Sequence, residues 1–529
     1  MSNELKHLAA QAAKGKISRR EFVGRAGALG VSSAMAGSLL ATAARAEGPV
    51  KGGLMRVGMQ GGSSTDSLDP ALAASEVPFQ VNESWGEKLV DVELNGMLGM
   101  RLAEEVSSNA DATQWMFKIR KGVEYHDGGT VTADDVVATL KRHTDENTKS
   151  GAQGIVKGIS EMKAEGDMVT LTLSSANADL PFLMADYHLI VQKGGGIDNP
   201  TSGIGAGAYK IVSNEPGVRV AFEKFANYWD ASRGHVDQAE VLVINDNTAR
   251  TAAIQSGQIH IMNRIDPKIV ALLAGAKDVV IERAAGPGHY VFIMHCDKAP
   301  YDNNDLRMAL KLAINRDEMV DKILGGMGSV GNDFPINAAY PLFDDSIPQR
   351  KFDLAAAAAA YKKSGHDGSP LMLQVAPGAF PGAVEAAQLF QASANAAGIP
   401  LQVKLEPDDG YWSNVWNVAP FCASYWGGRP VQDQMYSTAY LSTAEWNDTK
   451  FINPDFDKLL IAARGELDQA KRKAEYSQMA TMVRDTGGLI LPMFNDFVEG
   501  RRAEVGGWVS NPAGSLMNGK VLTLCWLNA

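Results

Sequence analysis

The stretch LMLQVAPGAFPGAVEAAQLFQASANAAGIPLQVKL, residues 371–405, decides the fold class of this chain. Its two ends, 371–376 and 401–405, are short apolar runs typical of strands, whereas 383–397 is rich in helix formers and ends at Gly398. A strand, a helix and a second strand in this order predict a parallel strand pair joined by a crossover helix. The sequence therefore predicts an α/β fold.

A candidate cleft follows from the strands of this region. A helix at 411–418 and a further strand at 420–426 are predicted next along the chain. In open α/β sheets, ligands bind beyond the carboxyl ends of the strands. The segments after the predicted strands are therefore expected at or near a cleft, namely 377–380, 408–412 and 425–433.

Tryptophan and tyrosine are concentrated in the same region. Eight of the chain's 22 such residues fall within 36 positions, where even spacing predicts roughly 1.5. Their side chains offer rigid apolar walls with a polar edge, which suits stacking on a ligand. We assign Trp416 to the core and Trp426, which precedes Gly427-Gly428, to the cleft. The eight are Tyr411, Trp412, Trp416, Tyr425, Trp426, Tyr436, Tyr440 and Trp446.

Two opposite charges follow the predicted strand at 420–426. Arg429 offers an anchor for a carboxylate and Asp433 one for an ammonium group, and a zwitterion needs both. The alternative is that the two side chains form a salt bridge with each other. The predicted ligand-binding residues are Arg429, Asp433, Trp426, Tyr425, Trp412, Asp409 and Tyr411.

Other segments outline the remaining elements. A strand is predicted at 54–59, and Thr132 with Asp135 forms a capping box that opens a helix. A second block begins near Pro287, with a strand at 290–295 and one helix over 305–324.

The first 46 residues have the pattern of an export signal. Basic residues precede a weakly apolar run, 26–43, and Ala44-Arg45-Ala46 forms a small-x-small cleavage pattern. Ser18-Arg19-Arg20-Glu21-Phe22 resembles the twin-arginine export motif. The alternative is a membrane anchor, but Gly, Ser and Thr make the run poorly hydrophobic. We expect cleavage after Ala46 and a location in the periplasm.

Composition and charge exclude several classes of protein. A length of 529 residues predicts three to four domains, and 45% hydrophobic with 21% charged residues is typical of a globular protein. Without residues 1–46, the chain has 43 basic and 59 acidic residues, a net charge of −16. An acidic protein repels phosphate backbones and anionic lipids, so no nucleic-acid or membrane-surface role is expected.

The sequence contains no enzyme or metal-site motif in the structural context that its function requires. Residues 326–331 match G-x-G-x-x-G but follow a predicted helix, the reverse of a dinucleotide site, and no G-x-S-x-G occurs. Cys296, Cys422 and Cys525 are widely separated, so at most one disulfide can form and no cysteine metal site is indicated. We expect no catalytic residue, no metal and no cofactor.

One long motif resembles a known family. Residues 115–128, WMFKIRKGVEYHDG, continuing to TADDV at 132–136, are similar to the block W-x-F-x-L-R-x-G-V-x-F-H-D-G…T-A-x-D-V of the family 5 extracytoplasmic solute-binding proteins. These are the dipeptide, oligopeptide and nickel-type receptors of ABC importers. Shorter matches follow in the family's order, so that the resemblance covers essentially the whole mature chain: 208–210, 227–229, 306–310, 314–316 and 492–494.

The resemblance implies a two-lobed periplasmic-binding-protein fold (type II, cluster C-like) with an extra subdomain on lobe one. The ligand would be trapped in a cleft by closure of the lobes. The implied division is a signal peptide at 1–46, lobe I at 47–90, the extra subdomain at 91–204, lobe I again at 205–286, lobe II at 287–489 and a return to lobe I at 490–529.

The resemblance also implies a role for the loop at 426–433. A loop led by Trp with acidic residues approaches the ligand in this family, and in peptide-binding members an Asp there takes the ammonium group, which carries over to Asp433. Arg429 stands where peptide receptors often have an acidic residue, and Gly205-Ala206-Gly207 replaces the usual G-T-G. The arginine admits a ligand with an additional anionic group.

We therefore expect a monomeric periplasmic receptor that captures a peptide-like zwitterion and delivers it to the permease of an ABC importer. Alternatives within the binding class are an opine-like or sugar-conjugated amino acid, a nickel chelate or heme. The alternative of another class is a secreted hydrolase.

Overall fold

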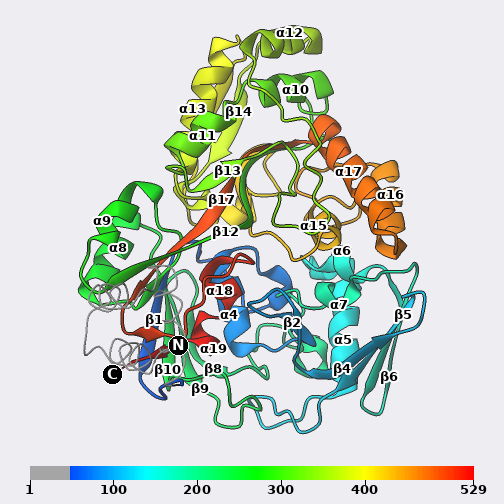
Figure 1. The fold of residues 1–529 in the computed structure, drawn as a ribbon, viewed down its shortest axis with the longest axis vertical. Coiled ribbons are helices and arrows are strands. Elements are labelled where there is room, and N and C mark those ends of the chain that lie inside the picture. The colour runs from blue at the N-terminus through cyan, green and yellow to red at the C-terminus, as the bar shows by residue number, and fades with distance from the viewer. Residues whose placement is uncertain (1–47, 529) are drawn as a thin grey trace, which may run out of the picture.

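The computed structural model describes residues 48–528, so the predicted signal segment and its cleavage site lie outside the described residues. The chain folds into two α/β lobes joined by a long ribbon of two strands (Figure 1). The predicted α/β class and two-lobed arrangement are confirmed. Among the helices between residues 48 and 528, none combines the length and the hydropathy that a membrane span requires.

One large sheet runs through both lobes. Its strands follow the order β15-β14-β16-β12-β17-β11-β1-β10-β9-β8, and β13 (Gly328–Val330) pairs with β17 beside this path. The strands are β15 (Leu401–Leu405), β14 (Leu371–Val375), β16 (Phe421–Trp426), β12 (Val279–Met294), β17 (Leu489–Arg502), β11 (Ile261–Met262), β1 (Leu54–Met59), β10 (Gln238–Val243), β9 (Arg219–Lys224) and β8 (Tyr209–Glu215).

Lobe I is built on β11, β1, β10, β9 and β8. The predicted strand at 54–59 is confirmed as β1, which runs parallel to both β10 and β11. The C-terminal helices α18 (Ser515–Gly519) and α19 (Val521–Leu524) pack on α4 (Glu76–Trp85). The lobe also contains α8 (Asn247–Ser256) and α9 (Val270–Ala274). The end of the chain therefore returns to the lobe in which it begins.

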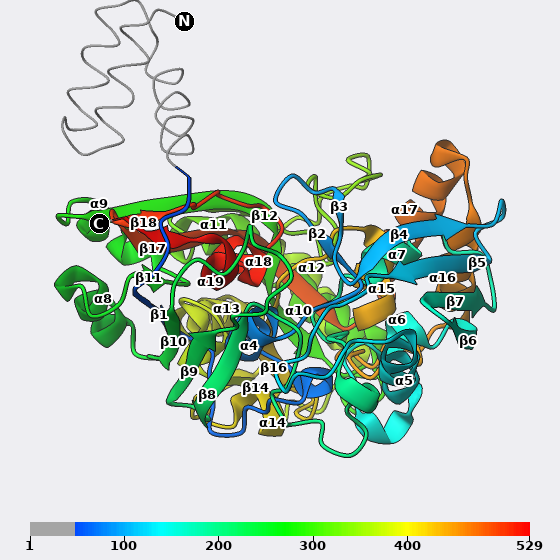
Figure 2. The same cartoon turned by 90° about the horizontal axis from the view of Figure 1, so that it is seen from below.

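An extra subdomain extends from lobe I. Its antiparallel sheet has the order β4-β5-β7-β6, with strands Ala103–Ser108, Gln114–Ile119, Met168–Leu173 and Ile159–Glu165. The predicted capping box is confirmed, because Thr132 and Asp135 cap α5 (Ala133–Thr144) reciprocally. Seen from below, this subdomain lies beside the helices of lobe II (Figure 2). The remaining helices here are α6 (Gln153–Val156) and α7 (Leu180–Leu183).

Lobe II contains the stretch that predicts the fold class. β14, α13 (Ala383–Ala396) and β15 form the predicted unit, and β14 pairs in parallel with β15. The prediction of one helix at 305–324 is wrong: α10 (Asn304–Leu312) ends before α11 (Arg316–Lys322), because the Asn315 side chain accepts from Glu318 N and caps a new helix. The predicted helix at 411–418 is only α14 (Tyr411–Asn414). The lobe further contains α12 (Leu354–Ser364), α15 (Gln432–Ala439), α16 (Pro454–Gly465) and α17 (Gln469–Thr486).

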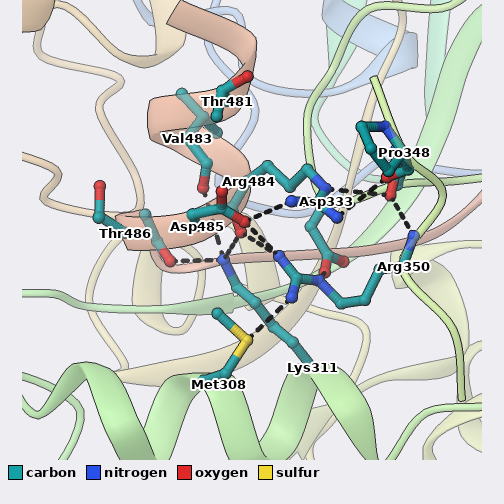
Figure 3. A network of polar contacts seen from close by, with 12 residues as sticks. Met308, Lys311, Asp333, Pro348, Arg350, Thr481, Val483, Arg484, Asp485 and Thr486 are labelled. Carbon is teal, nitrogen blue, oxygen red and sulfur yellow. Dashed lines mark hydrogen bonds and ion pairs between the residues drawn. The ribbon is translucent and has the colours of Figure 1, made fainter. Parts of the chain in front are cut away.

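A buried charge cluster fixes the end of α17 within lobe II (Figure 3). Asp333, which is fully buried, accepts from Arg316 Nη2 at 2.7 Å and from Arg350 Nε at 2.8 Å. Lys311 Nζ donates to the carbonyl oxygens of Arg484 and Gly487, both at 2.8 Å. Burial lowers the pKa of Lys311 to about 7. The cluster therefore joins α10 to the end of α17.

The ribbon that joins the lobes consists of β12 and β17. The first half of β12 pairs with β17 next to lobe I, and its second half, from His289, pairs with both β16 and β17 in lobe II. The register shifts between Ala285 and His289, at the Gly286-Pro287-Gly288 segment. A Cβ atom on Gly286 would lie 2.2 Å from the carbonyl oxygen of Pro512, so only glycine fits there. The strand predicted at 290–295 is thus the second half of a longer strand that serves both lobes.

Candidate ligand-binding cleft

Two adjoining cavities lie where the lobes meet. The space between the protein atoms there, including the part open to solvent, is about 880 and 520 Å³. Lobe I contributes α4 and the start of α18, lobe II contributes the segment after β16, and β17 contributes residues of the ribbon. Because both cavities share five lining residues, they form one cleft: Glu76, Tyr425, Gly427, Phe497 and Ser515.

Three of the predicted residues line this cleft. Tyr425 borders both cavities, Trp426 the smaller and Arg429 the larger. Trp412 stands behind Tyr425, with its ring edge-to-face at 5.1 Å between centroids. The carboxyl end of β16 thus positions aromatic side chains at the cleft, as the rule for open α/β sheets predicts.

The aromatic cluster divides between cleft and core. Trp416 lies in the core of lobe II, as predicted. Its Nε1 and that of Trp426 both donate to Asp448 Oδ2, at 3.0 and 3.2 Å. Burial raises the pKa of Asp448 to about 7, which the two indole donors only partly oppose. Trp426 therefore combines a structural hydrogen bond with a place in the cleft wall.

Arg429 does not pair with Asp433. Its Nη1 donates to the Gly428 carbonyl oxygen at 2.7 Å and its Nη2 to the Tyr187 hydroxyl at 3.0 Å. The nearest carboxylate oxygen is Asp186 Oδ2, which lies 3.7 Å from Nε. The mutual salt bridge considered from the sequence is therefore not formed.

Asp433 lies outside the cleft lining. The turn at 427–430 leads into α15, whose residues Asp433 and Gln434 contact Asn177 and Asp186, which lie in the segment predicted as the extra subdomain. The buried carboxylate accepts from Arg464 Nε at 2.7 Å, Ser437 Oγ at 2.8 Å and Asn177 Nδ2 at 3.0 Å. The carboxylate is fully buried and lines neither cavity, and both of its oxygens already accept from the protein, so Asp433 does not face a solute in the cleft.

Two more predicted residues lie away from the cavities. The buried Tyr411 hydroxyl donates to the Ala423 carbonyl oxygen at 2.8 Å, which ties α14 to β16 in the core. Asp409 is exposed and accepts from the backbone N and the Oγ of Ser64, both at 2.8 Å, and from Ser63 Oγ at 3.0 Å. Since Ser63 and Ser64 belong to lobe I, Asp409 contacts the opposite lobe.

The sequence reasoning missed Arg264 and Glu76. Arg264 Nε lies 2.9 Å from Glu76 Oε1, and Asn263 Nδ2 donates to Glu76 Oε2 at 2.6 Å. The guanidinium covers the ring of Tyr425, 3.8 Å from its centroid. Burial disfavours the charge of Arg264, but Glu76 and Tyr425 outweigh it and hold its pKa above the usual value. Their position after a strand could have identified Asn263 and Arg264 as cleft residues. Both directly follow β11, which is parallel to β1, and ligands bind beyond the carboxyl ends of such strands.

Glu499 is a second acidic residue that the sequence did not reveal. It lines the smaller cavity from β17, accepts from Ser515 Oγ at 2.7 Å and also accepts from Leu516 N. Burial raises its pKa to about 8, so the carboxyl group is mostly protonated at neutral pH. In residues 48–528, no three His, Cys, Asp or Glu side chains are arranged to hold a metal ion. All three cysteines are free thiols.

Comparisons with known proteins agree with this architecture. Residues 98–448 match the family model "Bacterial extracellular solute-binding proteins, family 5 Middle". The periplasmic oligopeptide-binding protein OppA of Haemophilus influenzae is 23% identical over 487 residues, which cover 82% of this chain and 87% of OppA.

Two solved structures resemble the whole fold. AgaA of A. tumefaciens R10, in complex with agropinic acid, aligns with a TM-score of 0.82 and 21% identity, covering 90% of this chain and 99% of AgaA. DppA of Helicobacter pylori, in complex with the peptide STSA, aligns with a TM-score of 0.83 and 19% identity, covering 92% of this chain and all of DppA. Since the family model spans more than half of the sequence, the chain belongs to family 5 of the bacterial extracellular solute-binding proteins.

Proposed function

We propose that this protein is a periplasmic receptor of an ABC importer that captures a peptide-like zwitterionic solute between its lobes and delivers it to the permease without chemical change. The observation that carries the proposal is the cleft itself, which is lined from both lobes and combines an aromatic wall with charged groups of both signs. Closure of such lobes on a solute shifts the equilibrium between open and closed states by the solute's differential affinity.

The charge of the larger cavity supports binding of an ammonium group there. Glu76, Glu83 and Asp186 line it, each in contact with a basic residue or histidine outside its lining, and Arg429 is its one basic lining residue. Arg429 keeps a proposed contact with the solute, because its buried Nε has no hydrogen-bond partner among the described residues. Tyr425 and Trp426 are the proposed walls, with Trp412 supporting Tyr425. For Asp433 we now propose a structural role.

Export completes the proposal. The twin-arginine pattern and the site after Ala46 support cleavage and a periplasmic location. The name of OppA of H. influenzae describes that relative as periplasmic as well. We propose that the mature protein acts as a monomer with ABC permease subunits as its partners.

A second candidate solute is an opine-like acid. Arg264 and Arg429 both line the cleft, and a solute with two anionic groups would use both. AgaA, which is 21% identical, is described with agropinic acid. This candidate changes the solute and leaves the receptor function as proposed.

The test is native mass spectrometry of the mature protein purified from its own host. The receptor proposal is supported if one amphoteric molecule per protein dissociates on denaturation. The mass of this molecule should also stay the same after long incubation with the protein. A solute that the protein converts to a product during incubation contradicts it and favours a hydrolase. A protein that is isolated empty and gains no thermal stability from peptides or opines also contradicts the proposal.

A further inference from the structure

We propose that Arg264 determines the specificity of the smaller cavity by binding a carboxylate of the solute. This inference rests on the proposed receptor function and adds the chemical class of one end of the solute.

The first observation is a pair of unused donors. Nη1 and Nη2 of Arg264 are both buried and have no hydrogen-bond partner among the residues that the structure describes. The side chain is only 5% exposed and lines the smaller cavity. Buried polar groups almost always have a partner, and leaving one unmet is costly. Two adjacent N–H groups on one guanidinium match the two oxygens of a carboxylate.

The second observation is that the guanidinium is held in place. Glu76 forms an ion pair with Nε of Arg264, and the guanidinium lies over the ring of Tyr425. Arg264 itself has a φ of 49°, in the left-handed region that a non-glycine residue seldom adopts. Contacts on two sides and a strained backbone are typical of a side chain that is positioned for binding.

The third observation is the charge balance of the smaller cavity. Arg264 is its one basic lining residue. Of its acidic residues, Glu76 is paired with Arg264 and Asp496 with Arg283. Burial keeps Glu499 mostly protonated at neutral pH, which removes a repulsive charge. Because Glu76 already shares the charge of Arg264, what Arg264 adds to the cavity is one pair of unused N–H donors, which suits a carboxylate better than a dianionic phosphate, which needs several donors.

The experiment compares two pools of probe solutes. One is a pool of di- to tetrapeptides from a protease digest of casein, and the other is the same pool after methyl esterification of its carboxylates. Native mass spectrometry measures the fraction of the mature protein that binds each pool. We expect the wild type to bind the free-acid pool at least tenfold better than the ester pool.

Variants then locate this preference. Arg264→Met should reduce the ratio of free-acid to ester binding to about one. Arg264→Lys keeps the positive charge beside Glu76, so that misfolding is avoided, and should lower this ratio several-fold. Arg219→Met is the matched control, because Arg219 is a partly exposed, ion-paired arginine of lobe I outside both cavities. It should keep the wild-type ratio.

The outcomes separate the two proposals. If Arg264→Met and Arg264→Lys weaken both pools equally, Arg264 is only structural and the inference is overturned while the receptor function stands. Equal binding of both pools by the wild type overturns it as well. If neither pool binds to the wild type, the peptide-receptor proposal fails and the inference fails with it.

Discussion

Replacing Asp433 by Asn tests whether this residue supports the fold or binds the solute. Its carboxylate is fully buried and neutralises Arg464, which is itself buried, through a contact of 2.7 Å. Removing one partner of a buried ion pair leaves the other charge uncompensated, at a typical cost of about 3–5 kcal/mol. We therefore expect Asp433→Asn to lower the free energy of unfolding of lobe II by about this amount.

The assay is urea-induced unfolding followed by tryptophan fluorescence, because four of the nine tryptophans lie in lobe II. The double variant Asp433→Asn with Arg464→Met should recover part of the loss, since it removes the unpaired charge as well. Asp455→Asn is the control, an 80% exposed acid of α16 in the same lobe, and should change stability by less than about 0.5 kcal/mol.

Asn177 extends the test to lobe closure. It belongs to the extra subdomain and donates to Asp433 across the boundary with lobe II. Hydrogen bonds to charged groups contribute about 1.5–3 kcal/mol, so Asn177→Ala should favour the open form by roughly that amount without destabilising lobe II. The reasoning is refuted if Asp433→Asn unfolds like the wild type but no longer binds the solute.

Three further predictions concern other contacts. Asp409→Ala should raise the open fraction of the solute-free protein, seen as a larger radius of gyration in small-angle X-ray scattering, because Ser63 and Ser64 lose their acceptor in lobe II; an unchanged radius would contradict this. Tryptophan fluorescence should titrate near pH 7, because ionisation of Asp448 places a charge beside Trp416 and Trp426. Since the pKa of Asp448 is raised in the folded state, its contribution to stability is complete below about pH 4 and is lost as the pH rises through 7; Asp448→Asn should abolish the titration, and a transition that persists in this variant has another origin. Asp333→Asn should lower the stability of lobe II by about 3–5 kcal/mol, because Arg316 and Arg350 lose their shared partner, yet leave solute affinity unchanged in calorimetry; loss of affinity in the folded variant would contradict a purely structural role.

The sequence predicts local elements well where the signals are local. The unit at 371–405 is found correctly because its apolar pattern and the stop at Gly398 depend only on neighbouring residues. The break at Asn315 was missed although Asn315 and Glu318 form a visible capping pattern, because an apolar face continues through it. The prediction gave more weight to periodicity than to the cap.

The residues of the candidate site were harder to predict from the sequence than the secondary structure. The same local sequence pattern is compatible with an aromatic residue in the core and with one at a cleft. The difference depends on contacts with segments that are distant in the sequence. Asn177 lies 256 positions before Asp433 and nonetheless occupies its carboxylate. Arg264 follows a strand of two residues, too short for its periodicity to be recognised. The carboxyl-end rule works for Tyr425 and Trp426 because β16 is long enough to be predicted.

The ribbon of β12 and β17 has a mechanical consequence. The chain enters and leaves lobe II through adjacent strands, with Tyr290 opposite Met493, so 295–488 is an insertion whose two ends lie side by side. A force that pulls the lobes apart along the ribbon is carried by two extended backbones in parallel, because both strands run from one lobe into the other. A twist requires only dihedral changes near Gly286-Pro287-Gly288, where the register already shifts. The two lobes are thus joined stiffly against stretching and softly against torsion, and rotation about the ribbon is the low-cost way to open the cleft.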